Sequence, residues 1–262
     1  MCTVTLRCGA GALSLTMNRD ERYERAPEEP PRRIPGEPGR PAWLAPFDSL
    51  SGGTWIGVNE CGVVGCVLNG YEPADEALGG AILVPSRGSI IPSILEEQDG
   101  LGRAQLPAAL DFSAYPSFTL LVASKDGGEI VRWRRGIGLA REVVSQGLTF
   151  LTSSSWNAPE VALRRRQAFD AWRAEGEPEL HGLPTFHVVT RPGDEGVAPF
   201  MTRDVSATRS ITSVQVDASR GLTSLTWWPR GHVTAIDPEY PGASLTIPLV
   251  ASVAGLAEGR QG

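Results

Sequence analysis

The chain has 262 residues, enough for one large domain or two small ones with a sizeable hydrophobic core. Its formal net charge of −6 argues against nucleic acid as a partner, and no apolar run approaches the roughly eighteen residues of a membrane-spanning helix. Four cysteines without metal or redox spacing, and no visible targeting segment, predict a reduced cytoplasmic location. We expect a single domain over residues 1–262.

Residues 2–21 are predicted to form a β-hairpin. Both arms are rich in Thr, Val and Leu, and the glycines between them can adopt the positive φ of a tight turn. A turn centred near positions 10 and 11 pairs Cys8 with Leu13 and brings Cys2 opposite Arg19. A slip of one residue would exchange the two faces of the strands. Either register brings a cysteine beside the Asn-Arg-Asp-Glu end of the second arm.

Cys2 combines a nucleophile with a nearby base. Its small side chain permits aminopeptidase removal of Met1, which would leave a free α-amino group on the residue that carries the thiol. Such an amine titrates at about 7.7–8.0 and a thiol at about 8.5, so the amine can act as the base near neutral pH. The alternative is an ordinary strand that begins with a buried cysteine, since cysteine is among the most buried residue types.

Residues 22–50 form the least regular stretch of the sequence. Seven prolines occur between Pro27 and Pro46, and proline is unsuited to a central strand or a helix interior. We therefore predict a loop over residues 22–50. Long loops in compact domains are usually lids, binding loops or disordered segments. This one either covers a site beside the charged cluster, as a lid, or forms a surface excursion.

Two strands are predicted after the proline-rich segment. Gly52 and Gly53 precede the first strand, an Asn-Glu-Cys-Gly turn joins it to the second, and the second ends at Asn69. Glycines within strands indicate that another backbone or a ligand comes close. Asn69 is interpreted either as a turn residue or as a polar group exposed at the sheet edge. Cys61 and Cys66 are expected to be buried in this hairpin.

The remaining residues predict further strands and helices. A helix is expected from residue 157, where a capping asparagine is followed by an early proline and an acid in the first turn. Its arginine run at 164–166 is interpreted as a solvated face or, alternatively, an anion site. The other expected elements are a helix over 89–97, strands over 118–124 and 129–134, one or two strands within 138–152, and strands over 186–190, 210–216 and 222–228.

Arg209 and the three histidines complete the set of candidate binding residues. Arg209 precedes a predicted strand, and its planar guanidinium suits either a substrate carboxylate or a salt bridge at the strand end. His181, His187 and His232 show no ligand spacing, so each is interpreted as structural or exposed. We therefore expect no metal site.

Four segments taken together resemble the NRDE family, which includes the transport and Golgi organisation proteins. They are Met1-Cys2-Thr3-Val4, Met17-Asn18-Arg19-Asp20-Glu21, Gly52-Gly53-Thr54-Trp55-Ile56-Gly57-Val58-Asn59 and Val67-Leu68-Asn69-Gly70. Their order and spacing cover about the first quarter of the chain. Ser86-Arg87-Gly88 and Thr152-Ser153-Ser154-Ser155 extend the match more loosely.

The resemblance implies an N-terminal-nucleophile (Ntn) hydrolase fold of the α/β (α+β) class, in which two antiparallel sheets lie between helical layers in the order αββα. More distantly, the chain is similar to choloylglycine hydrolase and penicillin V acylase. On that basis Cys2 is the nucleophile, Asp20 positions the freed α-amino group and Asn69 donates to an oxyanion. Two departures are visible. Met17 replaces the arginine before the family's Asn-x-Asp, and the serines at 153–155 stand in place of a second oxyanion asparagine.

The leading hypothesis is hydrolysis or transfer of an acyl group at a linear amide-type bond of a small molecule, through a Cys2 thioester and without a cofactor. Arg19 is expected to favour the thiolate in an open site, and Asp20 to be an exposed carboxylate that contributes little to stability. The competing hypothesis is a non-catalytic carrier of a hydrophobic ligand such as haem or a lipid. The candidate binding residues are Asn18, Trp55, Ser153 and Arg209.

Overall fold

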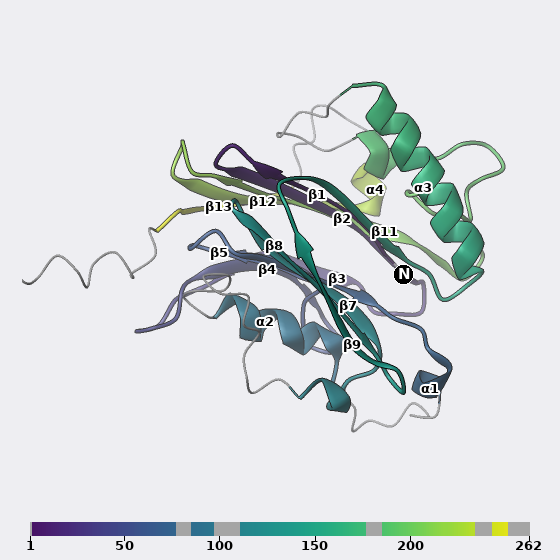
Figure 1. Cartoon of the computed structure of the whole chain (residues 1–262), viewed down its shortest axis with the longest axis horizontal. Helices are drawn as coiled ribbons and strands as arrows, with labels where there is room; N and C mark the ends of the chain where they lie inside the picture. The colour runs from purple at the N-terminus through teal and green to yellow at the C-terminus, as the bar shows by residue number, and fades with distance from the viewer. Residues whose placement is uncertain (1, 77–84, 97–110, 177–184, 234–242, 251–262) are drawn as a thin grey trace, which may run out of the picture.

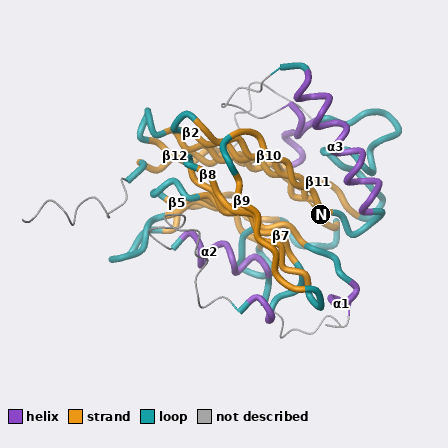
Figure 2. The backbone as a smooth tube through the Cα atoms, viewed as in Figure 1, coloured by secondary structure: helices purple, strands orange, loops and turns teal. Residues whose placement is uncertain are grey.

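Two antiparallel sheets are stacked face to face at the centre of the computed structural model, and helices lie on their outer faces (Figure 1). The structure describes residues 2–76, 85–96, 111–176, 185–233 and 243–250. A tube view shows α3 (Ala158–Ala174) outside one strand layer and α2 (Ile90–Leu95) outside the other (Figure 2). The expected αββα sandwich is therefore confirmed. Within the described ranges, no helix has the length and apolar character needed to cross a membrane.

The six-stranded sheet carries the N-terminal hairpin between two of its other strands. Its order is β10-β1-β2-β11-β12-β13, and all neighbours are antiparallel. Helix α3 packs on β10, and the short helix α4 packs on β11 and β12. The elements are β1 (Cys2–Gly9), β2 (Ala12–Arg22), β10 (Gly147–Ser153), β11 (Ser206–Asp217), β12 (Leu222–Pro229), β13 (Ala243–Pro248) and α4 (Arg230–Val233).

The seven-stranded sheet follows the chain in order from β3 to β9. Helix α2 packs on β5 and β6 and covers the face that points away from the other sheet. The strands are β3 (Glu28–Ile34), β4 (Trp43–Asp48), β5 (Ile56–Asn59), β6 (Val64–Asn69), β7 (Phe118–Ser124), β8 (Gly127–Arg134) and β9 (Gly138–Val144). The remaining short helices here are α1 (Pro73–Glu76), η1 (Arg87–Ser89) and η2 (Phe112–Ala114).

The N-terminal hairpin has the register that its turn predicts. The residues at positions 10 and 11 adopt φ of 52° and 77°, the left-handed region that closes a tight turn. Cys8 pairs with Leu13, and Cys2 pairs with Arg19. The predicted pairing is confirmed, so the local turn sets which residues meet at the open end of the hairpin.

Strand alternation divides the hairpin side chains between two environments. Val4 and Leu6 lie in the apolar core between the sheets, and Cys2 lies on the same face at the end of the strand. Thr3 faces the helical layer instead, where its hydroxyl accepts a hydrogen bond from Arg165. Successive residues of a strand point to opposite faces, so the two sides of this sheet end present different chemistry.

The predicted loop over residues 22–50 is wrong for two of its parts, which form β3 and β4. β3 is an edge strand, and prolines are tolerated there because their missing N–H groups leave no central ladder bond unmade. The register between β3 and β4 shifts between Glu29 and Arg32, at Pro30 and Pro31. Proline therefore falls on an edge and at a bulge, and the segment is not a lid-like loop.

A second correction concerns residues 186–190, which were predicted as a strand. They begin instead with the 3-10 turn η3 (Thr185–Val188). Phe186 and His187 are consecutive and both buried, because Phe186 contacts α3 whereas His187 contacts Thr5 of β1 and Asn18 of β2. Phe186 packs edge-on against Phe169 of α3. Phe186 favours a strand by its local propensity, but in the structure it packs against helix α3.

The helix predicted from residue 157 is present as α3, but two details differ. Asn157 adopts a left-handed φ of 41° and its side chain does not cap the helix. The solvated arginine run is wrong at its middle position, because Arg165 is fully buried. Arg165 lies four residues after Val161 and four before Phe169, so helical spacing places all three on the buried stripe.

Candidate active site

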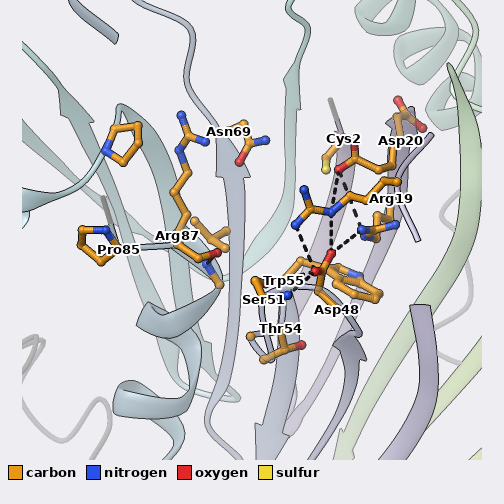
Figure 3. Close-up of a pocket in the computed structure, with 17 residues that line it drawn as sticks. Cys2, Arg19, Asp20, Asp48, Ser51, Thr54, Trp55, Asn69, Pro85 and Arg87 are labelled. Atoms are coloured by element: carbon orange, nitrogen blue, oxygen red, sulfur yellow. Dashed lines mark hydrogen bonds and ion pairs between the residues drawn. The ribbon is translucent and has the colours of Figure 1, made fainter. Parts of the chain in front are cut away.

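A cavity of about 510 Å³ lies where the ends of β1 and β2 face the seven-stranded sheet (Figure 3). Residues from both sheets line it. Asp48 of β4 and Arg87 of η1, which were not among the predicted site residues, are part of its wall. The predicted site residues that line the cavity are Cys2, Arg19, Asp20, Trp55 and Asn69.

The Cys2 thiol lies at the cavity end of β1 and is largely buried, with the residue 7% exposed. Burial raises the pKa of this thiol, and the charge of Asp20 raises it further. The positive charge of the N-terminus, a hydrogen bond with the Asp20 backbone and the charge of Arg19 lower the pKa without reversing the shift. The charge of Arg19 favours the thiolate, as expected, but burial outweighs it, and the expectation of an open site for this thiol is wrong. Cys2 is a protonated thiol that needs a base to become a nucleophile.

The Asp20 carboxylate points into the helical layer. One oxygen accepts a hydrogen bond from Arg165 Nη2 at 2.9 Å, and the other accepts from Thr208 Oγ1 at 2.6 Å. Neither side chain of the Asp20–Arg165 ion pair has any solvent exposure. The expectation of an exposed carboxylate is wrong, and because a buried charge depends strongly on its partner we now expect Asp20 to affect stability.

Arg165 connects Asp20 to the first strand. Its Nη1 group donates to Thr3 Oγ1 at 2.6 Å, to Thr152 Oγ1 at 3.2 Å and to the Cys2 carbonyl at 3.4 Å. Helix α3 thereby holds the ends of β1, β2 and β10 together beside the nucleophile. Sequence reasoning missed this residue, and the available signal was its position in the middle of the apolar stripe of α3.

Arg19 points into the cavity, where carboxylates surround it. Nη1 donates to Glu28 at 2.9 Å and Nη2 donates to Asp48 at 2.9 Å, while the guanidinium lies 4.5 Å from the centre of the Trp55 ring. Arg25 also binds Asp48, through hydrogen bonds of 2.7 and 3.0 Å. Figure 3 shows Arg19, Asp48 and Trp55 of this cluster below Cys2. Because Glu28 and Asp48 belong to the second sheet, Arg19 links the two sheets at the cavity.

Asp48 is kept ionised by this cluster. Burial alone would raise its pKa, but hydrogen bonds from Arg25 and the Ser51 backbone, with the charges of Arg25 and Arg19, lower the pKa to about 2. The Ser51 N–H donates to Asp48 Oδ1 at 2.9 Å. The sequence did not indicate this residue, because it lies in the segment that was predicted as a loop.

Asn69 ends β6 and reaches the cavity from the sheet that faces Cys2 (Figure 3). Its side chain makes no hydrogen bond to any residue within the described ranges. It also lines two neighbouring cavities, of about 790 and 210 Å³. The Asn69 amide is therefore open to a ligand in the cavity.

Ser153 lies beside the nucleophile without sharing its cavity. It pairs directly with Cys2 across β1 and β10, but it lines the smallest of the three adjoining cavities. Its hydroxyl oxygen is buried and has no hydrogen-bond partner among the residues that the structure describes. A role for Ser153 as the second oxyanion donor stays a prediction.

The structure does not bring Asn18 and Arg209 to the cavity. Asn18 is buried on the helical side, where it donates to the carbonyls of His187 and Pro199 at 2.9 Å each and contacts His187 Nδ1. Burial, with the charge of Arg165, lowers the pKa of His187 to about 3, so this histidine is neutral. Arg209 lies at a bulge in β11, where it binds a backbone carbonyl.

The fold is an Ntn-hydrolase-like α+β sandwich, and its first strand begins with a cysteine. The Caenorhabditis elegans N-acylethanolamine-hydrolyzing acid amidase ortholog aligns with a TM-score of 0.53 at 14% identity, over 81% of this chain and 92% of that chain. The sequence model of the family Transport and Golgi organisation 2 matches residues 1–186. The chain therefore belongs to this family, which confirms the resemblance read from its motifs.

Two further solved structures are similar at low identity. Penicillin V acylase from Agrobacterium tumefaciens aligns with a TM-score of 0.46 and 13% identity, over 96% of this chain and 92% of that one. A mutant conjugated bile acid hydrolase from Clostridium perfringens aligns with a TM-score of 0.49 and 11% identity, over 96% and 98%. A comparison with curated protein sequences found no match.

Proposed function

We propose that this protein is an N-terminal-cysteine amidohydrolase or acyltransferase that acts on a linear amide-type bond. The observation that carries the proposal is the position of the Cys2 thiol, in a cavity whose facing wall offers the Asn69 amide. The Ntn-hydrolase-like fold and the family membership are consistent with this chemistry.

The base in this proposal is the α-amino group of Cys2 after removal of Met1. Burial raises the pKa of the thiol, so attack requires that its proton be accepted by another group. No histidine is among the described residues that line the cavity. The Asp20 carboxylate already accepts hydrogen bonds from Arg165 and Thr208. An amine with a pKa of about 7.7–8.0 can accept the thiol proton near neutral pH.

The proposed reaction has two halves. The thiol proton passes to the amine as sulfur attacks the substrate carbonyl carbon, and the carbonyl electron pair becomes an oxyanion that Asn69 and backbone N–H groups stabilise. The ammonium then returns the proton to the leaving nitrogen as the C–N bond breaks, which leaves a Cys2 thioester. Attack by water, or by an acceptor amine in the transferase case, releases the acyl group and restores the thiol.

Trapping of the acyl-enzyme tests this function. Protein from its native host is incubated with a series of acyl p-nitroanilides, and intact mass with peptide mapping locates any acyl group. We expect a mature chain that begins at Cys2, an adduct on Cys2, and a loss of turnover of about a hundredfold or more in Cys2→Ala. Cys61→Ser is the matched control, because Cys61 lies outside the cavity.

Retention of Met1 in the native protein, or undiminished turnover in Cys2→Ala, would remove the mechanism. The competing carrier hypothesis predicts ligand binding without turnover of any anilide. A haem titration followed in the Soret band, and vesicle co-sedimentation for lipid, test that hypothesis directly.

A further inference from the structure

We propose that the Cys2 cavity takes substrates with an anionic oxygen group, a carboxylate or a phosphate, and that Arg87 binds this group. The inference rests on the proposed function in one respect, that the bound molecule is the substrate of Cys2. Binding of the anion itself does not depend on catalysis, so the two proposals can fail separately.

Neutral groups alone anchor Arg87. Its Nε donates to the Ser117 carbonyl at 2.8 Å and its Nη2 donates to the Gly70 carbonyl at 3.3 Å. In the described part of the chain it forms no ion pair with a carboxylate. Asp75 is near enough for its charge to act on Arg87, but its oxygens accept hydrogen bonds from Ser117 and from the Glu72 N–H. Among the residues that the structure describes, no carboxylate forms an ion pair with the half-buried Arg87 guanidinium, so its positive charge stays available to a ligand.

The other arginines of the cavity differ in this respect. Arg19 donates to Glu28 and Asp48, and Arg25 donates to Asp48 through two hydrogen bonds. Carboxylates already compensate both charges. Among the described residues that line the cavity, Arg87 is the arginine whose guanidinium hydrogen-bonds to carbonyls alone, and a carbonyl leaves its charge available to an anion.

Close backbone contacts hold the turn that carries Arg87. The Thr54 N–H donates to the Gly88 carbonyl at 3.0 Å, and a Cβ on Gly53 would lie 2.7 Å from the Gly88 carbonyl carbon. A Cβ on Gly70 would likewise lie 2.8 Å from backbone. Glycine permits these approaches because it has no side chain. The turn therefore packs directly on the segments that carry the rest of the cavity wall, and the position of Arg87 is preorganised.

The free part of the guanidinium faces the cavity. Figure 3 shows Arg87 extending beside Asn69, on the wall across from Cys2. Its remaining N–H groups have the planar geometry that suits carboxylate and phosphate oxygens. Trp55 supplies a second donor, because its indole N–H is buried and has no acceptor among the residues described. An unsatisfied buried donor is costly, and a ligand oxygen in the cavity would satisfy it.

Matched probes separate charge from shape. Two acyl anilides that differ only in a terminal carboxylate or carboxamide form one pair, and a phosphate and a hydroxyl form the other. We expect kcat/KM of the parent protein to be at least about tenfold higher for the anionic member of one pair. If the carboxylate–carboxamide pair shows the higher rate for the anion, the bound group is a carboxylate. If the phosphate–hydroxyl pair shows it, the bound group is a phosphate. Equal rates within both pairs would overturn the inference.

Variants then assign the preference to Arg87. Arg87→Gln should bring the anionic-to-neutral ratio close to one, and Arg87→Lys, which keeps the charge, should restore part of it. Arg220→Gln is the matched control, because Arg220 is exposed in the turn between β11 and β12 and should keep the ratio of the parent. A ratio unchanged in Arg87→Gln would overturn the assignment, as would an equal fall in Arg220→Gln.

Calorimetric binding of the same probes to Cys2→Ala keeps the inference independent of turnover. Tighter binding of the anionic probe, lost when Arg87→Gln is added, would support the inference even where the parent turns over no anilide. In that case the hydrolase proposal alone fails. Equal affinity of Cys2→Ala for charged and neutral probes would overturn the anion site while leaving a hydrolase possible.

Discussion

The two faces of the six-stranded sheet treat neighbouring residues of β2 differently. Arg19 projects into the cavity between the sheets, where Glu28 and Asp48 accept its hydrogen bonds. Asp20, the next residue, projects into the helical layer, where its cationic partner is Arg165. Because side chains alternate along a strand, a single step along the chain separates a charge cluster that lines the cavity from a fully buried pair.

The difference shows that the number of oppositely charged partners of a buried residue decides how much that residue contributes to stability. In the helical layer both side chains of the Asp20–Arg165 ion pair are fully buried, so loss of either one removes an ion pair from a buried charge. In the cavity the carboxylates are shared. Asp48 also binds Arg25, and Glu28 also accepts from Trp227 Nε1 at 3.2 Å. We therefore expect the helical-layer pair to dominate stability and the cavity cluster to dominate the response to pH.

The largest expected effect comes from breaking the helical-layer pair. Arg165→Met should lower the free energy of unfolding by about 3–5 kcal/mol, because the Asp20 charge stays buried and loses its ion pair with Arg165. Chemical denaturation measures the change. Arg164→Met is the matched control on the same helix, since Arg164 is half exposed, and its effect should be below about 0.5 kcal/mol. If the two variants lost similar amounts of unfolding free energy, the buried Asp20–Arg165 pair would be no more important for stability than an arginine on the surface.

Breaking the cavity cluster should have a smaller effect. Arg19→Met should lower the free energy of unfolding by about 1–3 kcal/mol, because Asp48 keeps its ion pair with Arg25 and Glu28 keeps its hydrogen bond from Trp227. Arg40→Met, which loses an exposed ion pair with Glu96, should change it by less than about 1 kcal/mol. A loss in Arg19→Met that exceeds that of Arg165→Met would reverse the comparison.

The cavity cluster should also respond to acid. The pKa of Asp48 is about 2 in the folded protein, below the ordinary value of about 3.9 expected for the unfolded chain. The folded state therefore favours the carboxylate, and this stabilisation is present above about pH 4 and lost as the pH falls toward 2. Asp48→Asn should reduce the slope of unfolding free energy against pH in this window.

Denaturant titrations at several pH values between about 2 and 5 measure that slope. Asp126→Asn is the control, because Asp126 is an exposed carboxylate in the turn between β7 and β8. It should keep the slope of the parent protein. An Asp48→Asn variant with the parent's slope would show that the cavity cluster does not carry the acid response.

The smallest expected effect is a change in thiol labelling. In a chain that retains Met1, iodoacetamide should modify Cys61 first. Cys61 is partly exposed, contrary to its predicted burial, whereas burial raises the pKa values of Cys2, Cys8 and Cys66. Removal of Met1 should raise the share of label on Cys2 about several-fold, because the α-amino group then acts as its base. Preferential labelling of Cys2 with Met1 in place would show that the cavity activates the thiol without the amine.

The predicted site residues that reached the cavity came from hairpins with clear turn signals. The first hairpin placed Cys2 opposite Arg19, and the second placed Asn69 at a strand end. Asn18 was assigned from a motif, but strand alternation turns it into the helical layer beside His187. Arg209 was assigned from its place before a strand, and a bulge in β11 leaves it outside the cavity. In both cases the motif specified the strand on which the residue lies, but not the face of the sheet to which its side chain points.

By itself, the sequence determined the local pairing of the first hairpin, because turn residues and alternation act over a few neighbouring positions, and the family resemblance of its motifs implied the class of the fold. Only the tertiary structure decided which charges meet. Arg165 lies 145 positions from Asp20, and although helical spacing places it on the buried stripe of α3, that spacing does not name its partner. The order of strands also decided that the prolines of β3 lie at an edge, where a missing N–H is harmless. Long-range packing selects partners that no local pattern encodes.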